Sequence, residues 1–264
     1  MKKFIFLISL FITTELYSAV LNSLGDATSY KINIRRIELC AAGSNVDSST
    51  GCLNPAIIFD GDSGDIDIAS TTAGAAAASL GNASKAVPGI TYSTIQVTME
   101  RSIKATATVT TKSAATSPAD QSCRTSASVA GTHSAGALGH VTNAAAETTL
   151  FVGIPETTTS DPNVESIAAI GGTGTAGTFS DAHTFFKWRG TLSQDFTMRA
   201  GKLPTVTVAF GTSSAIGFYN AYYGDSTGSQ NNDCDTRGSG ESGIDYSMHG
   251  FYGSEPDISI TIGY

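Results

Sequence analysis

The stretch YKINIRRIEL at residues 30–39 decides the fold class of this chain. Its apolar side chains alternate with polar ones at every second position, whereas the apolar stripe of a helix recurs every 3.6 residues. Alternation of this kind is typical of extended backbone, in which successive side chains point to opposite faces. The stretch therefore predicts a β-strand at the start of the folded body.

Further strand-like segments follow along the chain, and glycine and proline punctuate nearly all of them. The clearest are residues 66–68, 92–99, 103–111, 150–152, 183–188, 192–198, 206–210 and 258–262. Residues 92–99 and 103–111 predict either a hairpin or one long bent strand. The alanine-rich stretches 73–86 and 144–149 lack an amphipathic stripe. We interpret both as excursions between strands, with short helices at most.

Strands without crossover helices predict antiparallel pairing, and regular turn signals between them predict a β-sandwich or jelly roll. The sequence is thus expected to form an all-β domain over residues 30–264. A Thr/Ser-rich stretch at 110–142 divides this region, so two tightly joined lobes at 30–112 and 149–264 are the alternative to one body.

The first eighteen residues have the layout of a secretory signal peptide. Lys2 and Lys3 precede an apolar run at residues 4–12, which is much shorter than the about 20 residues that a membrane-spanning helix needs. We expect cleavage after Ser18 and a protein that is secreted or held at the cell surface, with an uncleaved anchor as the alternative. The paired lysines and the short apolar core favour a bacterial source.

Charge and composition exclude several classes of partner. The chain has a formal net charge of −8, and only 14% of its residues are charged. An acidic, sparsely charged surface does not attract nucleic acid, so we expect none as a partner. No stretch after the leader is long and apolar enough for a transmembrane helix.

The four cysteines are an even number, which in an exported chain predicts two disulfides. Three pairings are open. We favour Cys40 with Cys52, because the intervening residues are rich in turn formers, and this leaves Cys123 with Cys234 as a long-range bridge. A structural metal site is the alternative use of cysteine, but no CxxC spacing supports it.

No catalytic motif survives comparison with its required context. Residues 61–64 read Gly-Asp-Ser-Gly, as around a chymotrypsin-type nucleophile, yet every histidine follows Ser63 in the chain, the reverse of that family's order. Residues 224–228 fit GxSxG, but the polar residues after Ser226 cannot form the helix that a nucleophile elbow needs, although His249 follows in the right order.

Residues 172–177 match GxGxxG without a following helix or a βαβ unit, so a dinucleotide site is not expected. We therefore predict that the protein is not an enzyme and carries no cofactor, with a hydrolase based on Ser226 and His249 as a minor alternative.

Four aspartates crowd one glycine-rich turn: Asp60, Asp62, Asp65 and Asp67. Dense carboxylate oxygens are the ligands that calcium prefers in extracellular proteins. The order of residues departs from the EF-hand loop, because Gly64 and Asp65 are exchanged relative to that pattern. A weak calcium site is one expectation for this turn, and a solvated hairpin is the other.

A short apolar segment precedes the first predicted strand, within residues 19–29. Val20, Leu21 and Leu24 are separated from that strand by Gly25 and Asp26. An extended terminal segment of this kind can complete the sheet of a neighbouring molecule by donor-strand complementation. Packing on its own domain, or fraying, is the alternative.

The chain ends with Ile258, Ile260, Ile262 and Tyr264 on one face of a predicted strand. This ending resembles the final strand of secreted, pilin-type β-sandwich subunits that form fibres, over about eight residues. It is also similar to the closing strand of outer-membrane β-barrels, but the chain lacks regular ten-residue amphipathic strands with aromatic girdles. The pilin resemblance implies assembly by strand addition.

These observations predict an exported structural protein, a subunit of an extracellular fibre, pilus or surface layer that polymerises with itself head to tail. The alternative is an adhesin module that binds surface glycans through exposed aromatic residues, with or without calcium at the acidic turn. The candidate aromatic residues are Trp188, Tyr219, Tyr222 and Tyr223. A membrane-spanning β-barrel is a third possibility.

Overall fold

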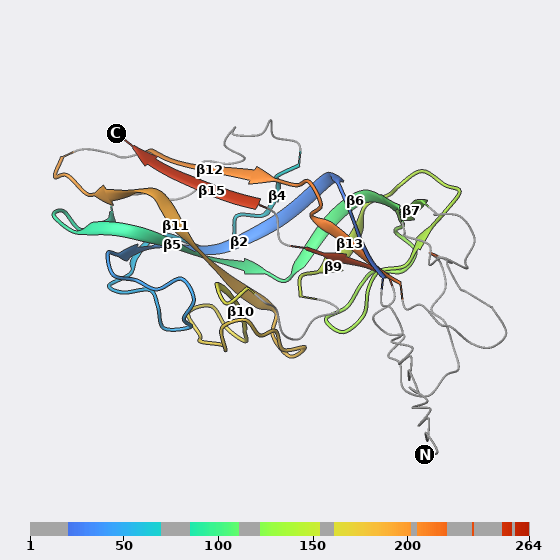
Figure 1. Ribbon diagram of the computed structural model, residues 1–264, viewed down its shortest axis with the longest axis horizontal. Helices are drawn as coiled ribbons and strands as arrows, with labels where there is room; N and C mark the ends of the chain where they lie inside the picture. The colour runs from blue at the N-terminus through green and yellow to red at the C-terminus, as the bar shows by residue number, and fades with distance from the viewer. Residues whose placement is uncertain are drawn as a thin grey trace, which may run out of the picture.

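The computed structural model describes residues 21–69, 85–110, 122–153, 161–201, 205–220, 234, 250–254 and 257–263. The expected leader at residues 1–18 and Val20 lie outside the described residues, as does most of the alanine-rich stretch 73–86. Figure 1 shows an elongated arrangement of strands, with two small sheets against a large, strongly curled one.

Two long antiparallel strands run through the large sheet. One is β2 (Ala27–Ala41), which confirms the strand predicted at residues 30–39. The other consists of β5 (Thr91–Glu100) and β6 (Ser102–Thr110), which are separated by Arg101 alone. β5 pairs with the C-terminal half of β2, and β6 pairs with its N-terminal end. Of the two arrangements predicted for residues 92–111, the long bent strand is therefore the one observed.

The remaining strands of the large sheet flank this pair. β3 (Ala56–Asp60) and β4 (Asp65–Asp67) line the opposite edge of β2. β11 (Phe185–Thr197) pairs with β5, and β10 (Val164–Ile167) pairs with β11. Beyond β6 lie β9 (Thr148–Phe151), β7 (Ser122–Thr125) and β8 (Gly139–His140).

Two small sheets pack against the large one. The first consists of β1 (Leu21–Gly25), β13 (Ile216–Asn220) and β14 (Gly250–Gly253), and it contacts β6 and β9. The second consists of β12 (Thr205–Gly211) and β15 (Asp257–Gly263), and β15 contacts β11. Figure 1 shows the two small sheets at different ends of the curled sheet.

Side-chain alternation explains why these segments form packed strands. Along β6, Ile103, Ala105, Ala107 and Val109 are buried, and Lys104 and the two threonines at 108 and 110 are exposed. The buried set joins one hydrophobic core with residues of every sheet, including Tyr30, Leu150, Phe218 and Ile260. Burial of apolar surface at about 25 cal/mol per Å² is the main driving force for this packing.

The predicted fold class is confirmed: the described chain is nearly all β, and all its paired strands are antiparallel. Strands from the stretches 30–112 and 149–264 share the large sheet, where β5 pairs with β11 and β6 with β9. None of the described segments is a helix with the length and apolar character needed to cross a membrane.

Both favoured disulfides are present. Cys40 at the end of β2 is bonded to Cys52, and Cys123 in β7 is bonded to Cys234, 111 residues further along the chain. No cysteine is left free. Disulfides persist in oxidising compartments, so the pair indicates an oxidising, extracellular environment.

Loss of the Cys123–Cys234 bridge should lower the free energy of unfolding by about 2 kcal/mol more than loss of the Cys40–Cys52 bridge. The reason is loop length, since the sequence separations are 111 and 12 residues, and the entropy lost by the unfolded chain grows with the logarithm of the loop. Urea unfolding of the two double-serine variants measures the difference. A larger loss from the Cys40/Cys52 variant would contradict this account.

Candidate functional site

The first described strand, β1, contains the segment that the sequence marked for assembly. β1 pairs antiparallel with β13 of its own chain, with Leu21 opposite Asn220 and Gly25 opposite Ile216. It is the edge strand of the three-stranded sheet. The structure thus shows the self-packed arrangement of this segment, and it identifies β13 as the strand edge that β1 fits.

The joint between β1 and β2 is held by specific contacts. A Cβ atom at Gly25 would lie 2.8 Å from the carbonyl oxygen of Thr108, so only glycine allows this close approach to β6. The Asp26 carboxylate accepts a hydrogen bond of 3.1 Å from the Ser214 backbone N–H. The chain therefore changes from one sheet to the other within two residues.

The side chains of β1 are placed unusually for a strand packed on its own domain. Leu24 is 53% exposed, and Ser23 on the opposite face is buried. Full burial of a leucine is worth about 1.5–3 kcal/mol, a contribution that Leu24 does not make in the single molecule. The outer face of β1 is therefore an apolar position available to a second molecule.

The C-terminal strand β15 also has an apolar face. Ile260 and Ile262 are almost fully buried in the common core, and Ile258 packs against it. Among the described strands, β15 is hydrogen-bonded only to β12. Tyr264, the aromatic end of this face, lies outside the described residues.

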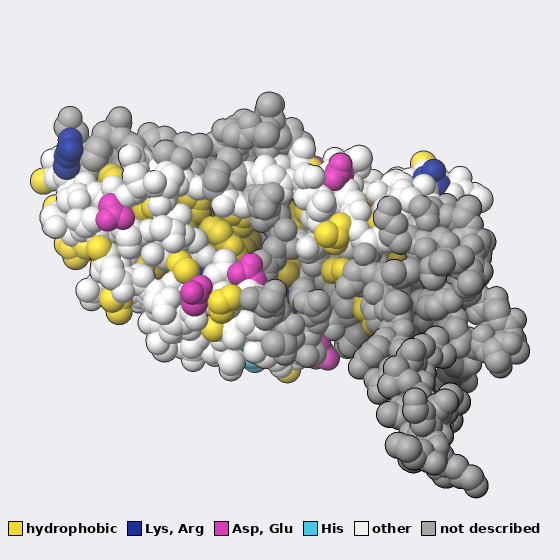
Figure 2. Space-filling view, viewed as in Figure 1, with side chains coloured by type: hydrophobic (Ala, Val, Ile, Leu, Met, Phe, Trp, Pro, Cys, Tyr) yellow, Lys and Arg dark blue, Asp and Glu magenta, His cyan; other side chains and the backbone are white. Residues whose placement is uncertain are grey.

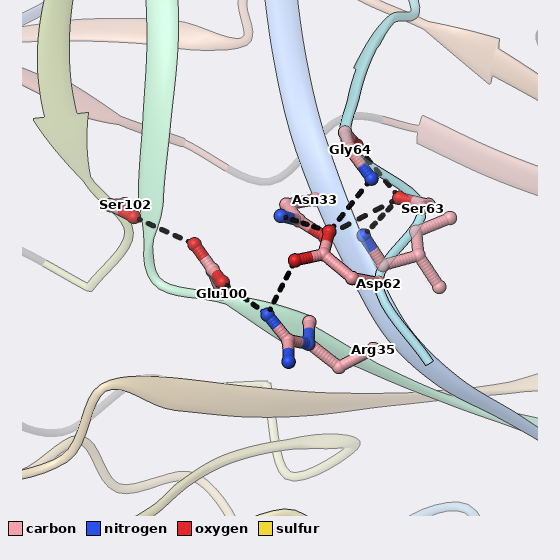
Figure 3. Close-up of polar contacts among 8 residues, drawn as sticks. Asn33, Arg35, Asp62, Ser63, Gly64, Glu100 and Ser102 are labelled. Atoms are coloured by element: carbon pink, nitrogen blue, oxygen red, sulfur yellow. Dashed lines mark hydrogen bonds and ion pairs between the residues drawn. The ribbon is translucent and has the colours of Figure 1, made fainter. Parts of the chain in front are cut away.

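The acidic turn lies at the bend of the two long strands, as Figure 3 shows. Arg35 of β2 places its Nη1 atom 2.9 Å from Glu100 Oε1 and 3.1 Å from Asp62 Oδ2. The other oxygen of Asp62 accepts hydrogen bonds from Gly64 N, at 2.8 Å, and from Asn33 Nδ2, at 2.9 Å. The bond from Gly64 first, and then that from Asn33, lowers the pKa of Asp62.

The other three aspartates point to partners of their own. Asp60 binds the guanidinium of Arg36, Asp65 accepts a 2.6 Å bond from Lys104, and Asp67 accepts a bond from the Ser29 hydroxyl. The hydrogen bond to Asp65 raises the pKa of Lys104. No group of carboxylate, histidine or cysteine side chains in the described part of the chain could hold a metal ion. In the structure the carboxylates of Asp60, Asp62, Asp65 and Asp67 are each directed to separate partners and not to a common point.

Replacing Asp62 with alanine should destabilise the protein near neutral pH and have less effect as the pH falls. The folded-state pKa of Asp62 lies below the ordinary value of 3.8, so its contribution is present above that value and is lost as the carboxylate protonates through the lowered pKa. Urea unfolding of wild type and Asp62→Ala across this range measures the effect. Asp195→Ala, at an exposed position of β11, is the control; a difference that does not change with pH would contradict the assignment.

Of the two candidate nucleophiles, the structure describes Ser63 alone. Ser63 accepts a hydrogen bond from Ile34 N and donates one to the Gly64 carbonyl oxygen, so its hydroxyl stabilises the turn. Ser226 and His249 lie outside the described residues. Residues 172–177 form a loop beside β10, which agrees with the absence of the helix that a dinucleotide site requires.

The aromatic candidates are not presented as one platform. The Trp188 ring covers Gly190, where a Cβ atom would lie 2.1 Å from the ring, and Trp188 packs against the core. Tyr219 lies in β13 opposite Asn22 and is partly buried. Tyr222 and Tyr223 lie outside the described residues. Packing therefore explains Trp188 without a ligand.

The structure also contains a polar cluster that the sequence did not reveal. We call it the polar layer; its side chains cover one face of strands β10, β11, β5 and β2, and its members are Glu38, Gln96, Thr98, Glu165, Lys187 and Arg189. All are buried. These residues alternate with apolar ones such as Ile95, Val97 and Phe186, a pattern that is typical of a strand with one face toward solvent, so alternation alone gives no signal that they are buried.

A small open recess lies beside β9, lined by Lys104, Ala127, Ala130, Glu147, Thr148 and Thr149. Its volume of about 180 Å³ is below the roughly 300–1,000 Å³ that small-molecule sites occupy. It is too small to support a ligand-based function.

Comparisons of the chain with protein-family models, with curated proteins and with solved structures find no match.

Proposed function

We propose that this protein is an exported structural subunit that assembles with copies of itself into an extracellular fibre, pilus or surface layer. Assembly occurs by exchange of the N-terminal strand: β1 of one molecule pairs with the β13 edge of the next. The protein acts by contact, without turnover of a substrate. The predicted leader and the two disulfides support export from a bacterial cell.

The observation that carries this proposal is the pairing of β1. A five-residue strand at the beginning of the described chain occupies a strand edge with regular antiparallel register, from Leu21 opposite Asn220 to Gly25 opposite Ile216. The same hydrogen bonds form whether β1 comes from its own molecule or from another, so exchange retains them. A head-to-tail series of such exchanges does not close and produces a polymer.

Exchange also has a favourable contribution that the single molecule lacks. Leu24 is 53% exposed in the single molecule. The proposed filament includes a second contact between neighbouring subunits over this face of β1, and burial of Leu24 there would add to the stability of the assembly. Few charges oppose this approach, since 14% of the chain is charged. Carboxylates of the acidic turn are paired with arginine or lysine, which limits repulsion between copies.

Leu24→Asp should reduce polymer formation strongly, because it places a charge at the contact that assembly buries. Leu53→Asp is the matched control, since Leu53 is 46% exposed and directly follows Cys52, outside the sheet that contains β1. Negative-stain electron microscopy and size-exclusion chromatography of the exported protein measure filament content. Wild-type protein that stays a monodisperse monomer, and is unchanged by deletion of residues 19–26, would refute the proposal.

A cysteine pair should show which molecule supplies β1. Asn22 and Tyr219 lie opposite each other in the β1–β13 register, and no native cysteine is free to react with new ones. In filaments of Asn22→Cys/Tyr219→Cys, exchange predicts a ladder of disulfide-linked oligomers on a non-reducing denaturing gel. Filaments that dissolve entirely into cross-linked monomers would show that another surface drives assembly.

A further inference from the structure

The sheet formed by β10, β11, β5 and β2 is buried on both faces, and only one face is apolar. On the other face the polar layer is ordered in rows across the strands. Glu165 is opposite Lys187, Lys187 is opposite Thr98, and Thr98 is opposite Arg36. A segment of small residues, 168–178, lies over this row; we call it the glycine-rich cover.

The charges in the polar layer are paired with one another. Arg189 donates from Nη2 to Glu165 Oε1 at 2.8 Å and from Nε to Gln96 Oε1 at 2.8 Å. Gln96 in turn donates to Glu38 Oε2 at 2.5 Å. Lys187 Nζ lies 3.4 Å from Glu165 Oε1. Two acidic and two basic side chains thus form a network that is electrically balanced within the sheet.

The cover is attached to this layer by polar contacts. Lys187 Nζ, in the middle of the row, donates a hydrogen bond to the Gly172 carbonyl oxygen. At the far end, Gly177 N donates to Val164 O at 2.7 Å, and Ser166 N donates to Thr178 O at 3.1 Å. Ile170 is the single large apolar side chain of the cover. Lifting the cover therefore exposes little apolar surface.

The backbone of the cover contains glycines where it must turn and where it touches the sheet. Gly171 and Gly177 have φ values of +80° and +71°, a conformation that favours glycine. A Cβ atom at Gly174 would lie 2.1 Å from the Ser166 carbonyl oxygen, so the cover rests directly on β10 there. The two glycines with positive φ, Gly171 and Gly177, thus lie on either side of Gly174, where the backbone of the cover contacts the backbone of β10 directly.

Two buried polar atoms beneath the cover, Thr98 Oγ1 and Glu165 Oε2, have no hydrogen-bond partner in the described protein. A buried polar group without a partner raises the free energy of the closed state, and contact with water removes that penalty. Opening of an apolar core has no such compensation. Separating the cover from the polar layer therefore costs less free energy than exposing the apolar face of the same sheet.

We propose that residues 168–178 form a lid that opens over the polar layer, hinged at Gly171 and Gly177 and held shut by Lys187. In the open state water reaches Glu165, Lys187 and Thr98 while the sheet beneath stays intact. This inference is independent of the proposed assembly, because β1 and β13 belong to a different sheet.

Native-state hydrogen exchange of the full protein tests the lid. Amides of residues 166–178 should exchange roughly tenfold faster than those of β5 and β11, with little dependence on low concentrations of urea. Such behaviour indicates local opening, since global unfolding exposes much surface and depends steeply on urea. Exchange of this segment with the urea dependence of global unfolding would overturn the proposal.

Two variants test the backbone contact of Gly174 with Ser166 and the hydrogen bond from Lys187 to Gly172. Gly174→Ala inserts a methyl group against Ser166 O and should accelerate exchange in 166–178 without affecting β12 and β15; Thr173→Ser, an exposed neighbour, is its control. Lys187→Met removes the bond to Gly172 and should do the same, with the surface lysine variant Lys104→Met as control. Unchanged exchange in Gly174→Ala would contradict the lid even if Lys187→Met fails to fold.

Discussion

The structure depends on one shared bend in its two longest strands. β2 and the continuous pair β5 and β6 run antiparallel over the whole large sheet, and they bend together at Arg35 and Arg101. At Arg35 the register of β2 shifts by one residue relative to β5, which is a β-bulge. A bulge increases local twist, so the sheet curls at this point and packs with a different small sheet on each side of it.

Two arginines stabilise the bend. Arg35 is bonded to Glu100 and Asp62 on the more exposed side. Arg101 is completely buried, and it donates hydrogen bonds to the carbonyl oxygens of Val152 and Ser180, at 3.0 and 2.6 Å. It thereby connects β9 with the loop that leads into β11. The bend is thus stabilised by charge-assisted hydrogen bonds, from Arg35 to carboxylates and from Arg101 to backbone carbonyl oxygens.

Local sequence patterns predicted the strands, but they did not predict which segments pack over each face of the sheet. The alternation at residues 30–39 predicted β2, and the turn-rich residues between Cys40 and Cys52 predicted their bond. The alternation along β5 and β11 separates two faces of the sheet without showing what lies over each, so the burial of the polar face does not follow from it. The Cys40–Cys52 loop and residues 168–178 cover that face, and this burial depends on contacts between distant segments, such as that of Arg189 with Ser49.

The acidic turn shows a second case in which residue spacing did not predict how side chains are arranged. Its aspartates are close in sequence, which suggested convergence on one ion. β3 and β4, however, pair with different parts of β2 and direct Asp60 to Arg36, Asp65 to Lys104 and Asp67 to Ser29. Close spacing of carboxylates along a chain produces a metal site only when the backbone between them directs the side chains to one common point. Here the bend in β2 separates them.

The pairing of β1 with β13 determines when this protein can finish folding. Leu21 meets its partner strand only after residue 220 has been synthesised, and Cys123 must wait for Cys234. Contacts so remote along the sequence impose a large loop-closure entropy and make folding slow. Until residues 220 and 234 have been synthesised, the emerging chain can form neither the β1–β13 ladder nor the Cys123–Cys234 bridge.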